Sequence, residues 1–252
     1  MCTVVISHRP ASPWPVAIAA NRDEMVARPW DPPAAHWPER PGVVGGRDRL
    51  AGGTWMAMRG GLVAAVLNRP GSLGPAEGFR SRGELPLLAL EHPSAAEAAR
   101  AVAALPGGAW RPFNLVIADC GGAWLVIGTG DGALTRRRLG EGMTMVTAIG
   151  ADEGETARAR RHLPRVRALA HPVPGEAKAW AEALGASDAE EGAGPRGGLT
   201  VPPDRGYGTV AASLVFLPAD DTAPVWLFAA GAAGAVPFQP VALADAAVSA
   251  QA

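Results

Sequence analysis

Two short apolar runs near the start of the chain decide the fold: TVVIS at residues 3–7 and VAIAA at residues 16–20. Prolines interrupt the segment between them, and a proline-rich break between two β-prone runs is typical of a turn. The pattern predicts an antiparallel hairpin centred near Ser12. In that register Ile6 faces Ile18 across the two strands.

The same register places the most reactive residues of the segment together. Val4 faces Ala20, and one further step brings Arg22 opposite Cys2. The run NRDE at residues 21–24 then lies beside the N-terminus. A thiol, an α-amine, a guanidinium and two carboxylates would share one end of the sheet, even if the looped connection shifts the register by a residue or two.

Cys2 follows Met1 directly, and we expect Met1 to be removed because aminopeptidases trim methionine before small side chains. A cysteine at the first position carries a thiol nucleophile and an α-amine with a pKa of about 7.7–8.0 that can act as its base. Arg22 favours the thiolate, and Asp23 orients the ammonium group or Arg22. The alternative is that Cys2 has no role and that residues 22–24 form a solvated, self-paired turn.

These residues resemble the NRDE family, also called the transport-and-Golgi-organisation family. The family resembles N-terminal-nucleophile hydrolases of the bile-salt hydrolase and penicillin acylase type. The resemblance therefore implies an α+β fold, a four-layer αββα sandwich of two antiparallel sheets, and amide-bond or acyl-transfer chemistry at Cys2. The matching motifs occur in the family's order: MCT at 1–3, ANRDE at 20–24, GGTW at 52–55, VLN at 66–68, SRGEL at 81–85, FNL at 113–115 and YGT at 207–209.

The resemblance also implies roles for individual residues. The predicted catalytic residues are Cys2, Arg22, Asp23 and Asn68, and the predicted substrate-binding residues are Asn21, Trp55, Arg82 and Asn114. Two positions depart from the family pattern. Val146-Thr147-Ala148 stands where the family has Leu-Ser-Asn, and Val210 stands where it has an arginine after Tyr-Gly-Thr.

Residue chemistry alone leaves alternatives for two of these assignments. Asn68 ends a strand, so its amide can donate to an oxyanion or cap a turn. Arg82 precedes a short helix, where it can bind a substrate carboxylate or phosphate, or pair locally with Glu84. The paired glycines Gly52-Gly53 predict either a tight turn or a close backbone approach that forms a wall near the substrate.

Composition bounds the fold and the partners. The chain has 252 residues, 48% of them apolar, and a net charge of −1. We expect one domain over residues 1–240 and a tail at 241–252 that frays. A near-neutral chain whose one basic run is Arg136–Arg138 is not expected to bind nucleic acid.

The sequence lacks the motifs of several other classes of protein. The histidines show no paired spacing and Gly-x-Ser-x-Gly is absent, so we expect no metal, no cofactor and no serine triad. A single lysine, Lys178, leaves no Walker motif. No secretory signal or membrane-spanning run is found, and two cysteines make no disulfide framework, so we expect a cytoplasmic protein with Cys120 as an inert buried thiol.

Local patterns predict hairpins, then helices, and then the same alternation again. Strands are expected within residues 54–67, 113–148 and 209–229. Helices are expected at 83–90, 95–105 and 176–184, and at 153–170 with a break at Pro164. Residues 28–46, rich in proline and tryptophan, are expected to form an irregular loop that covers the Cys2 end or wraps the surface.

Two functions of different classes follow. One is a cysteine N-terminal-nucleophile amidohydrolase or acyltransferase acting on a small amide or acyl substrate. The other is a non-enzymatic carrier of a hydrophobic ligand in the same cleft, because the resembled family is linked with haem and acyl-lipid handling.

Overall fold

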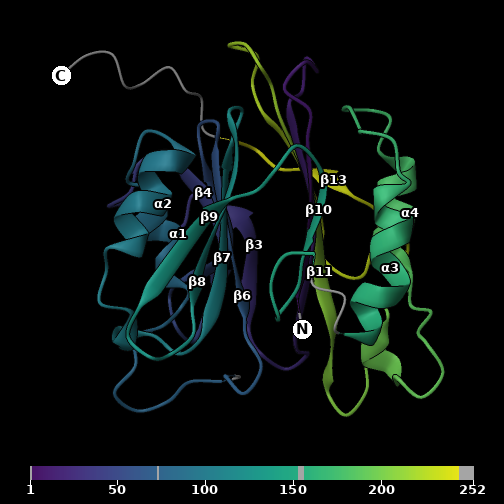
Figure 1. The fold of residues 1–252 in the computed structure, drawn as a ribbon, viewed down its shortest axis with the longest axis horizontal. Helices are drawn as coiled ribbons and strands as arrows, with labels where there is room; N and C mark the ends of the chain where they lie inside the picture. Colours follow the sequence, from purple (N-terminus) through teal and green to yellow (C-terminus); the bar gives the residue numbers. More distant parts are fainter. Residues whose placement is uncertain (1, 73, 153–155, 244–252) are drawn as a thin grey trace.

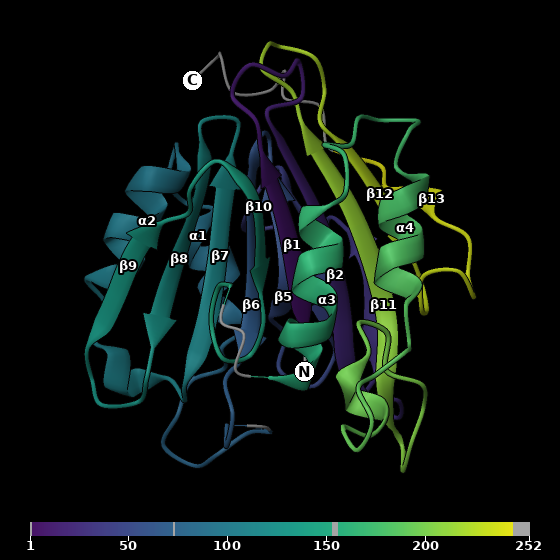
Figure 2. The same ribbon diagram turned by 45° about the vertical axis from the view of Figure 1, so that its right-hand side comes forward.

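The computed structural model describes residues 2–72, 74–152 and 156–243. Two antiparallel sheets stack face to face, and helices cover both outer faces (Figures 1 and 2). The layers therefore run helix, sheet, sheet, helix, which confirms the predicted α+β sandwich of two antiparallel sheets. Among the described residues, no helix has the length and apolar character needed to span a membrane.

The first sheet contains the N-terminal hairpin. Its strand order is β10-β1-β2-β11-β12-β13. The strands are β1 (Thr3–His8), β2 (Val16–Met25), β10 (Gly142–Val146), β11 (Tyr207–Leu217), β12 (Val225–Ala229) and β13 (Gln239–Pro240).

The second sheet keeps the order of the chain, β3-β4-β5-β6-β7-β8-β9. Its strands are β3 (Trp30–Ala34), β4 (Val43–Asp48), β5 (Thr54–Arg59), β6 (Leu62–Asn68), β7 (Phe113–Asp119), β8 (Gly122–Gly128) and β9 (Leu134–Arg138).

The helices fall into two pairs, one for each sheet. α1 (Glu84–Ala89) and α2 (Ala95–Ala103) contact the second sheet, whereas α3 (Ala157–Arg167) and α4 (Lys178–Gly185) contact the first. Two short 3₁₀ turns, Gly107–Ala109 and Pro195–Gly197, lie in the connections. Ser94 caps α2 as its capping-box sequence predicts, because its hydroxyl accepts a hydrogen bond from the Glu97 amide at 3.3 Å.

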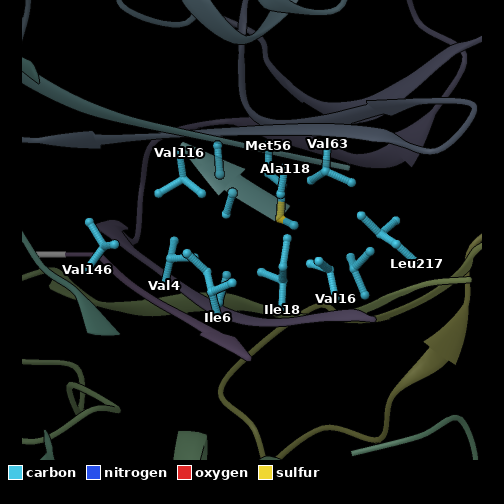
Figure 3. Packing of buried hydrophobic residues seen from close by; sticks show 14 of the residues in the cluster. Val4, Ile6, Val16, Ile18, Met56, Val63, Val116, Ala118, Val146 and Leu217 are labelled. Atoms are coloured by element: carbon cyan, nitrogen blue, oxygen red, sulfur yellow. The ribbon is translucent and has the colours of Figure 1, made fainter. Parts of the chain in front are cut away.

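The alternation of β1 and β2 sorts their side chains between two layers. Val4, Ile6 and Ile18 face the second sheet and pack against residues such as Met56 and Val116 (Figure 3). The residues between them, including Val5 and Ala19, face α3 and α4 instead. Successive strand residues point to opposite faces, so neighbouring residues of β2 serve different layers.

The register of the N-terminal hairpin is the predicted one. Val4 pairs with Ala20, Ile6 pairs with Ile18, and the last pair is Thr3 with Asn21. One further step along both strands leads to Cys2 and Arg22.

The segment of residues 28–46 was expected to be an irregular loop, and that prediction was wrong. The segment supplies β3 and the start of β4, with Trp30 paired with Asp48. β3 is an edge strand, and an edge tolerates Pro32 and Pro33 because one side of the strand needs no donors. The pairing shifts register across these prolines.

Two smaller expectations also fail. α3 continues through Pro164 without the predicted break, since the packing of its buried face outweighs the loss of one amide donor. Cys120 is exposed rather than buried, because it lies in the turn between β7 and β8. Residues 244–252 of the predicted tail lie outside the described residues.

Candidate functional site

A cleft with a volume of about 270 Å³ opens at the end of the sandwich where β2 and β6 finish. Figure 1 shows the loop between β6 and α1, drawn in blue, at this lower end of the molecule. The cleft brings together most of the predicted site: Cys2, Arg22, Asp23, Trp55, Asn68 and Arg82 all line it. Asn21 and Asn114 do not line this cleft.

Cys2 lies immediately before β1, and its thiol donates to the Asp23 carbonyl at 3.8 Å. Burial raises the pKa of the Cys2 thiol, and Asp23 raises it further. Arg22 lowers it, as expected, but does not outweigh the burial. The net effect is a raised pKa of the Cys2 thiol, so the thiol needs a base at the moment of reaction.

Arg22 faces the cleft from β2 and is 5% exposed. Its guanidinium carbon lies 4.1 Å from the centre of the Trp55 ring and 5.8 Å from that of Trp30, which is cation–π geometry. Nη2 lies 3.6 Å from Asp48. Nη1 is buried without a hydrogen-bond partner among the described residues. Burial lowers the pKa of Arg22, yet the group stays charged and keeps one donor uncommitted.

Asp48 and Arg28 belong to the site and were not predicted. Arg28 Nε donates to Asp48 Oδ2 at 2.5 Å, and the Ala51 amide donates to Oδ1 at 2.9 Å. Burial by itself raises the pKa of Asp48, but these hydrogen bonds outweigh it and hold the pKa below its usual range. The carboxylate therefore stays ionised beside Arg22. No sequence motif indicates a role for Asp48, because its partner Arg28 lies 20 residues earlier, in the connection between β2 and β3.

Asp23 lies next to Arg22 in sequence, yet its side chain faces the opposite layer. Its carboxylate is 3.2 Å from Arg158 on α3 and accepts from Thr209 Oγ1 at 2.6 Å. Both partners of the ion pair are at most 1% exposed. Arg158 also donates to Thr3 Oγ1 at 2.9 Å. The Asp23 backbone borders the cleft, and the side chain joins β2 to β11 and α3. Its catalytic role stays a prediction.

Asn21 and Asn114 hold backbone carbonyls within the protein. Asn21 Nδ2 donates to the carbonyls of Leu184 and Leu199 at 3.0 and 2.9 Å. Asn114 Nδ2 donates to the carbonyls of Thr147 and Ala148 at 2.8 and 3.1 Å. The departures from the family pattern at residues 147 and 148 thus contribute main-chain acceptors. Substrate contacts by Asn21 and Asn114 stay predictions.

Asn68 ends β6 opposite Phe113 and lines the cleft half-buried. Its side-chain amide can donate a hydrogen bond, as the predicted oxyanion contact requires. The backbones of Gly53 and Gly83 nearly touch beside it, since a Cβ on Gly53 would lie 2.5 Å from the Gly83 carbonyl carbon. The predicted close backbone approach is confirmed, and it joins the β4–β5 turn to the start of α1.

Arg82 lines the cleft and does not pair with Glu84, whose partner is Arg80. Arg82 Nη1 donates to Ser72 Oγ at 2.7 Å and to the Pro112 carbonyl at 3.3 Å. Burial, and then the like charge of Arg111, lower the pKa of Arg82 to about 10. Arg82 is thus a half-buried, charged donor held by neutral acceptors.

Among the described residues, no three His, Cys, Asp or Glu side chains form a group that could hold a metal ion. The side chains that line the cleft include a thiol, arginines, carboxylates, hydroxyls and an amide.

Comparison with known proteins sets this geometry in context. No curated protein matches the chain. Among solved structures, a Caenorhabditis elegans N-acylethanolamine-hydrolyzing acid amidase (NAAA) ortholog superposes with a TM-score of 0.57 at 14% identity, over 84% of this chain and 92% of that one. This likeness shows that the two proteins share a fold. The family model described as Transport and Golgi organisation 2 matches residues 1–149, and the chain therefore belongs to that family.

Proposed function

We propose that the chain is a cysteine amidohydrolase or acyltransferase of the N-terminal-nucleophile type, acting on a small amide or acyl substrate. One observation carries the proposal. The Cys2 thiol and the Arg22 guanidinium line the same cleft from adjacent strands, and Arg22 Nη1 is buried there without a partner among the described residues. A buried donor left unpaired costs about 1–3 kcal/mol, so a ligand oxygen that accepts from it would recover that energy.

The reaction starts from a neutral thiol, in keeping with the raised pKa of Cys2. With Met1 removed, the α-amine of Cys2 takes the thiol proton as sulfur attacks the acyl carbon. The C–N bond breaks, the amine leaves with that proton, and a thioester forms on Cys2. Water, or an acceptor amine in the transferase case, then releases the acyl group and restores the thiol.

Charge that develops on the acyl oxygen needs donors. Asn68 lines the cleft with Cys2 and is our proposed oxyanion donor, a role whose loss typically costs 10²–10³-fold in turnover. Arg22 is our proposed positioning group for the substrate carbonyl or for the thiolate. Trp55 holds Arg22 by stacking against it.

The test uses p-nitroanilide amides of acetate, butyrate and hexanoate with purified wild type, Cys2→Ala and Cys120→Ala. Cys120 is a matched control because it is the other cysteine and is exposed outside the cleft. We expect Cys2→Ala to lose at least about 10³-fold in turnover and Cys120→Ala to keep wild-type turnover. Retained turnover in Cys2→Ala would contradict the proposal.

A hydrophobic-ligand carrier is the second candidate, and one observation favours it. Phe79 lines the cleft and is 45% exposed, an apolar surface that a bound ligand would cover. For haem, the cleft offers Cys2 as its iron ligand of the thiolate class. A haem titration of wild type and Cys2→Ala tests this candidate. A shifted Soret band that depends on Cys2 supports it, and an unshifted band at stoichiometric haem contradicts it for haem.

A further inference from the structure

We infer that the acyl group of the substrate is short, no longer than butyryl, because its chain end enters a small apolar recess beside Cys2 whose size is limited by Met56. The inference rests on the proposed function for the reaction. It also makes a claim about the space beside the Cys2 sulfur, and that claim can be measured without turnover.

The recess lies between the two sheets and has a volume of about 20 Å³, room for about one methyl group. Four residues line both the recess and the cleft: Cys2, Arg22, Trp55 and Val66. Cys2 therefore borders both spaces. An acyl carbon bonded to its sulfur can direct its chain into the recess while the leaving amine lies in the cleft.

The two spaces differ in polarity. Among the described residues, five arginines and three acidic residues line the cleft, whereas Arg22 is the one charged residue that lines the recess. The other walls of the recess include Val4, Ala20 and Met56. Each methylene group that leaves water for such a wall improves binding by about fourfold. An acyl chain therefore gains more in the recess than among the charges of the cleft.

Arg22 gives the acyl group its orientation. Its Nη1 is buried without a hydrogen-bond partner among the described residues, and Arg22 lines both spaces. An acyl oxygen that accepts from Nη1 lies at the border between the two spaces, and the chain can extend from there into the recess.

Small side chains at matched positions of three strands make the recess. Along β2 the residues that face the second sheet change from Ile18 to Ala20. Along β11 their partners change at the same step from Val215 to Ser213. Ala65 on β6 lines the recess from the second sheet. The larger residues, Ile18 among them, fill the core between the sheets (Figure 3), and the smaller ones leave room next to Cys2.

Met56 is the residue that limits the chain length. Among the residues that line the recess and not the cleft, it has the largest apolar side chain. It is 1% exposed, pairs with Ala65 across β5 and β6, and lies between the sheets in Figure 3. Met58, two residues along β5, belongs to the same core and is 2% exposed, but it does not line the recess. The two methionines therefore form a matched pair that differs in contact with the recess.

Turnover of the acetyl, butyryl and hexanoyl p-nitroanilides is measured as kcat/KM for wild type, Met56→Ala and Met58→Ala. One methylene group too many for a hydrophobic pocket changes kcat/KM by about 10–200-fold. We therefore expect the hexanoyl amide to fall at least about tenfold below the better of the two shorter amides in wild type. Met56→Ala should raise the hexanoyl-to-butyryl ratio at least about tenfold, and Met58→Ala should leave it unchanged.

Ala65→Val tests the recess in the opposite direction, because the two added methyl groups reduce its volume. It should lower the butyryl-to-acetyl ratio at least about tenfold. Ratios between substrates within one variant do not depend on the fraction of the protein that is folded. Melting temperatures show which variants fold, and Ala65→Val decides the question if Met56→Ala does not.

Thiol labelling measures the same space without turnover. In the Cys120→Ala background Cys2 carries the one thiol of the chain. The probes are the methyl, propyl and pentyl methanethiosulfonates, from which the thiolate displaces methanesulfinate and forms an alkyl disulfide. The outer sulfur takes the place of the acyl carbon, so the three labels stand for acetyl, butyryl and hexanoyl. Labelling rates are followed by intact mass and divided by the rates with glutathione. We expect the pentyl label to react at least about tenfold more slowly than the methyl label, and Met56→Ala to remove most of that difference.

The possible results separate the two proposals. A labelling limit that Met56→Ala relieves, together with no turnover by wild type, supports the inference and contradicts the proposed function. Amide hydrolysis by wild type with equal kcat/KM for the three amides overturns the inference and leaves the proposed function standing. Equal normalised labelling rates overturn the inference, as does a length limit that shifts equally in Met56→Ala and Met58→Ala. An unchanged butyryl-to-acetyl ratio in Ala65→Val also overturns it.

Discussion

Arg22 and Asp23 are neighbours on β2, but they lie in different environments. Arg22 faces the cleft, stacks on Trp55 at 4.1 Å and leaves Nη1 without a partner among the described residues. Asp23 faces the helix layer, where Arg158 and Thr209 bind its carboxylate. A group with unused hydrogen-bonding capacity is suited to bind a ligand, whereas a satisfied buried pair is suited to hold the fold.

The side chains of the NRDE motif therefore lie in two different layers of the fold. The run NRDE reads as a single cluster in the sequence, but a strand sends alternate residues to opposite faces. Cys2 and Arg22 share the cleft face, while Asn21 and Asp23 share the helix face.

Asp23→Asn should cause the largest change in stability. It leaves the Arg158 charge buried with a neutral partner, and breaking a buried ion pair costs about 3–5 kcal/mol. Chemical denaturation with urea measures the free energy of unfolding. Glu24→Gln, the same charge change at a partly exposed residue, is the control and should cost under about 1 kcal/mol. A similar cost for both variants would remove the distinction between the two faces.

Arg22→Lys should affect turnover more than stability. Lysine keeps the charge, but it cannot stack flat on the Trp55 ring and it lacks the planar fork of N–H donors of a guanidinium. We expect turnover of the amide substrates to fall about 10²-fold, with a change in the free energy of unfolding of at most about 1 kcal/mol. Arg49→Lys, at an arginine that is 58% exposed, should match wild type in both assays. A fully active Arg22→Lys would show that the cleft face does not use this guanidinium.

Gly53→Ala tests the close backbone contact between Gly53 and Gly83. The new methyl group would meet the Gly83 backbone, which cannot rotate away, so we expect a loss of about 1–3 kcal/mol. Gly61→Ala, where the structure has open space and no positive φ, should be stable. Equal melting temperatures for the two variants would show that the contact between residues 53 and 83 relaxes without cost.

The helix layer should also give the protein a mild sensitivity to acid. His171 Nε2 lies 2.7 Å from the Trp14 carbonyl and Nδ1 lies 2.7 Å from Ser7 Oγ. Burial lowers the pKa of His171 despite the hydrogen bond to Trp14. Below the usual pKa of about 6.5 the unfolded chain binds the extra proton first. The free energy of unfolding should therefore fall as the pH falls from about 6.5 through the lowered pKa of the folded state.

His171→Gln should flatten that dependence in part, since burial also lowers the pKa of His8 and His162. Melting temperatures between pH 5 and 8 give the slope for wild type, His171→Gln and the partly exposed control His92→Gln. This is the smallest of the expected effects. A wild-type slope in His171→Gln would contradict the assignment of this histidine.

The sequence predicted those parts of the fold that depend on local pattern. The β1–β2 register followed from two apolar runs and a proline-rich turn, and it placed Arg22 beside Cys2 without any knowledge of the second sheet. The family resemblance supplied the stacking of the two sheets. β3 was missed because Pro32 and Pro33 argue against a strand unless the strand is known to lie at an edge.

The sequence predicted only those residues of the site that belong to recognisable motifs. Asp48, Arg28 and Arg158 were missed because their partners are distant in sequence, and only the packing of layers brings them together. The predicted effect of Arg22, which lowers the pKa of Cys2, has the right direction, but a sequence shows a neighbouring charge and not the depth of burial, and burial raises this pKa overall.

An intact-mass measurement on protein that is acid-quenched during turnover of butyryl p-nitroanilide tests whether Cys2 is the nucleophile. The account predicts a chain that begins at Cys2 and carries one butyryl group as a hydroxylamine-sensitive thioester on the Cys2 thiol. It also predicts that Cys2→Ala carries none. A chain that keeps Met1, or a butyryl group on Cys120 in place of Cys2, would contradict the account.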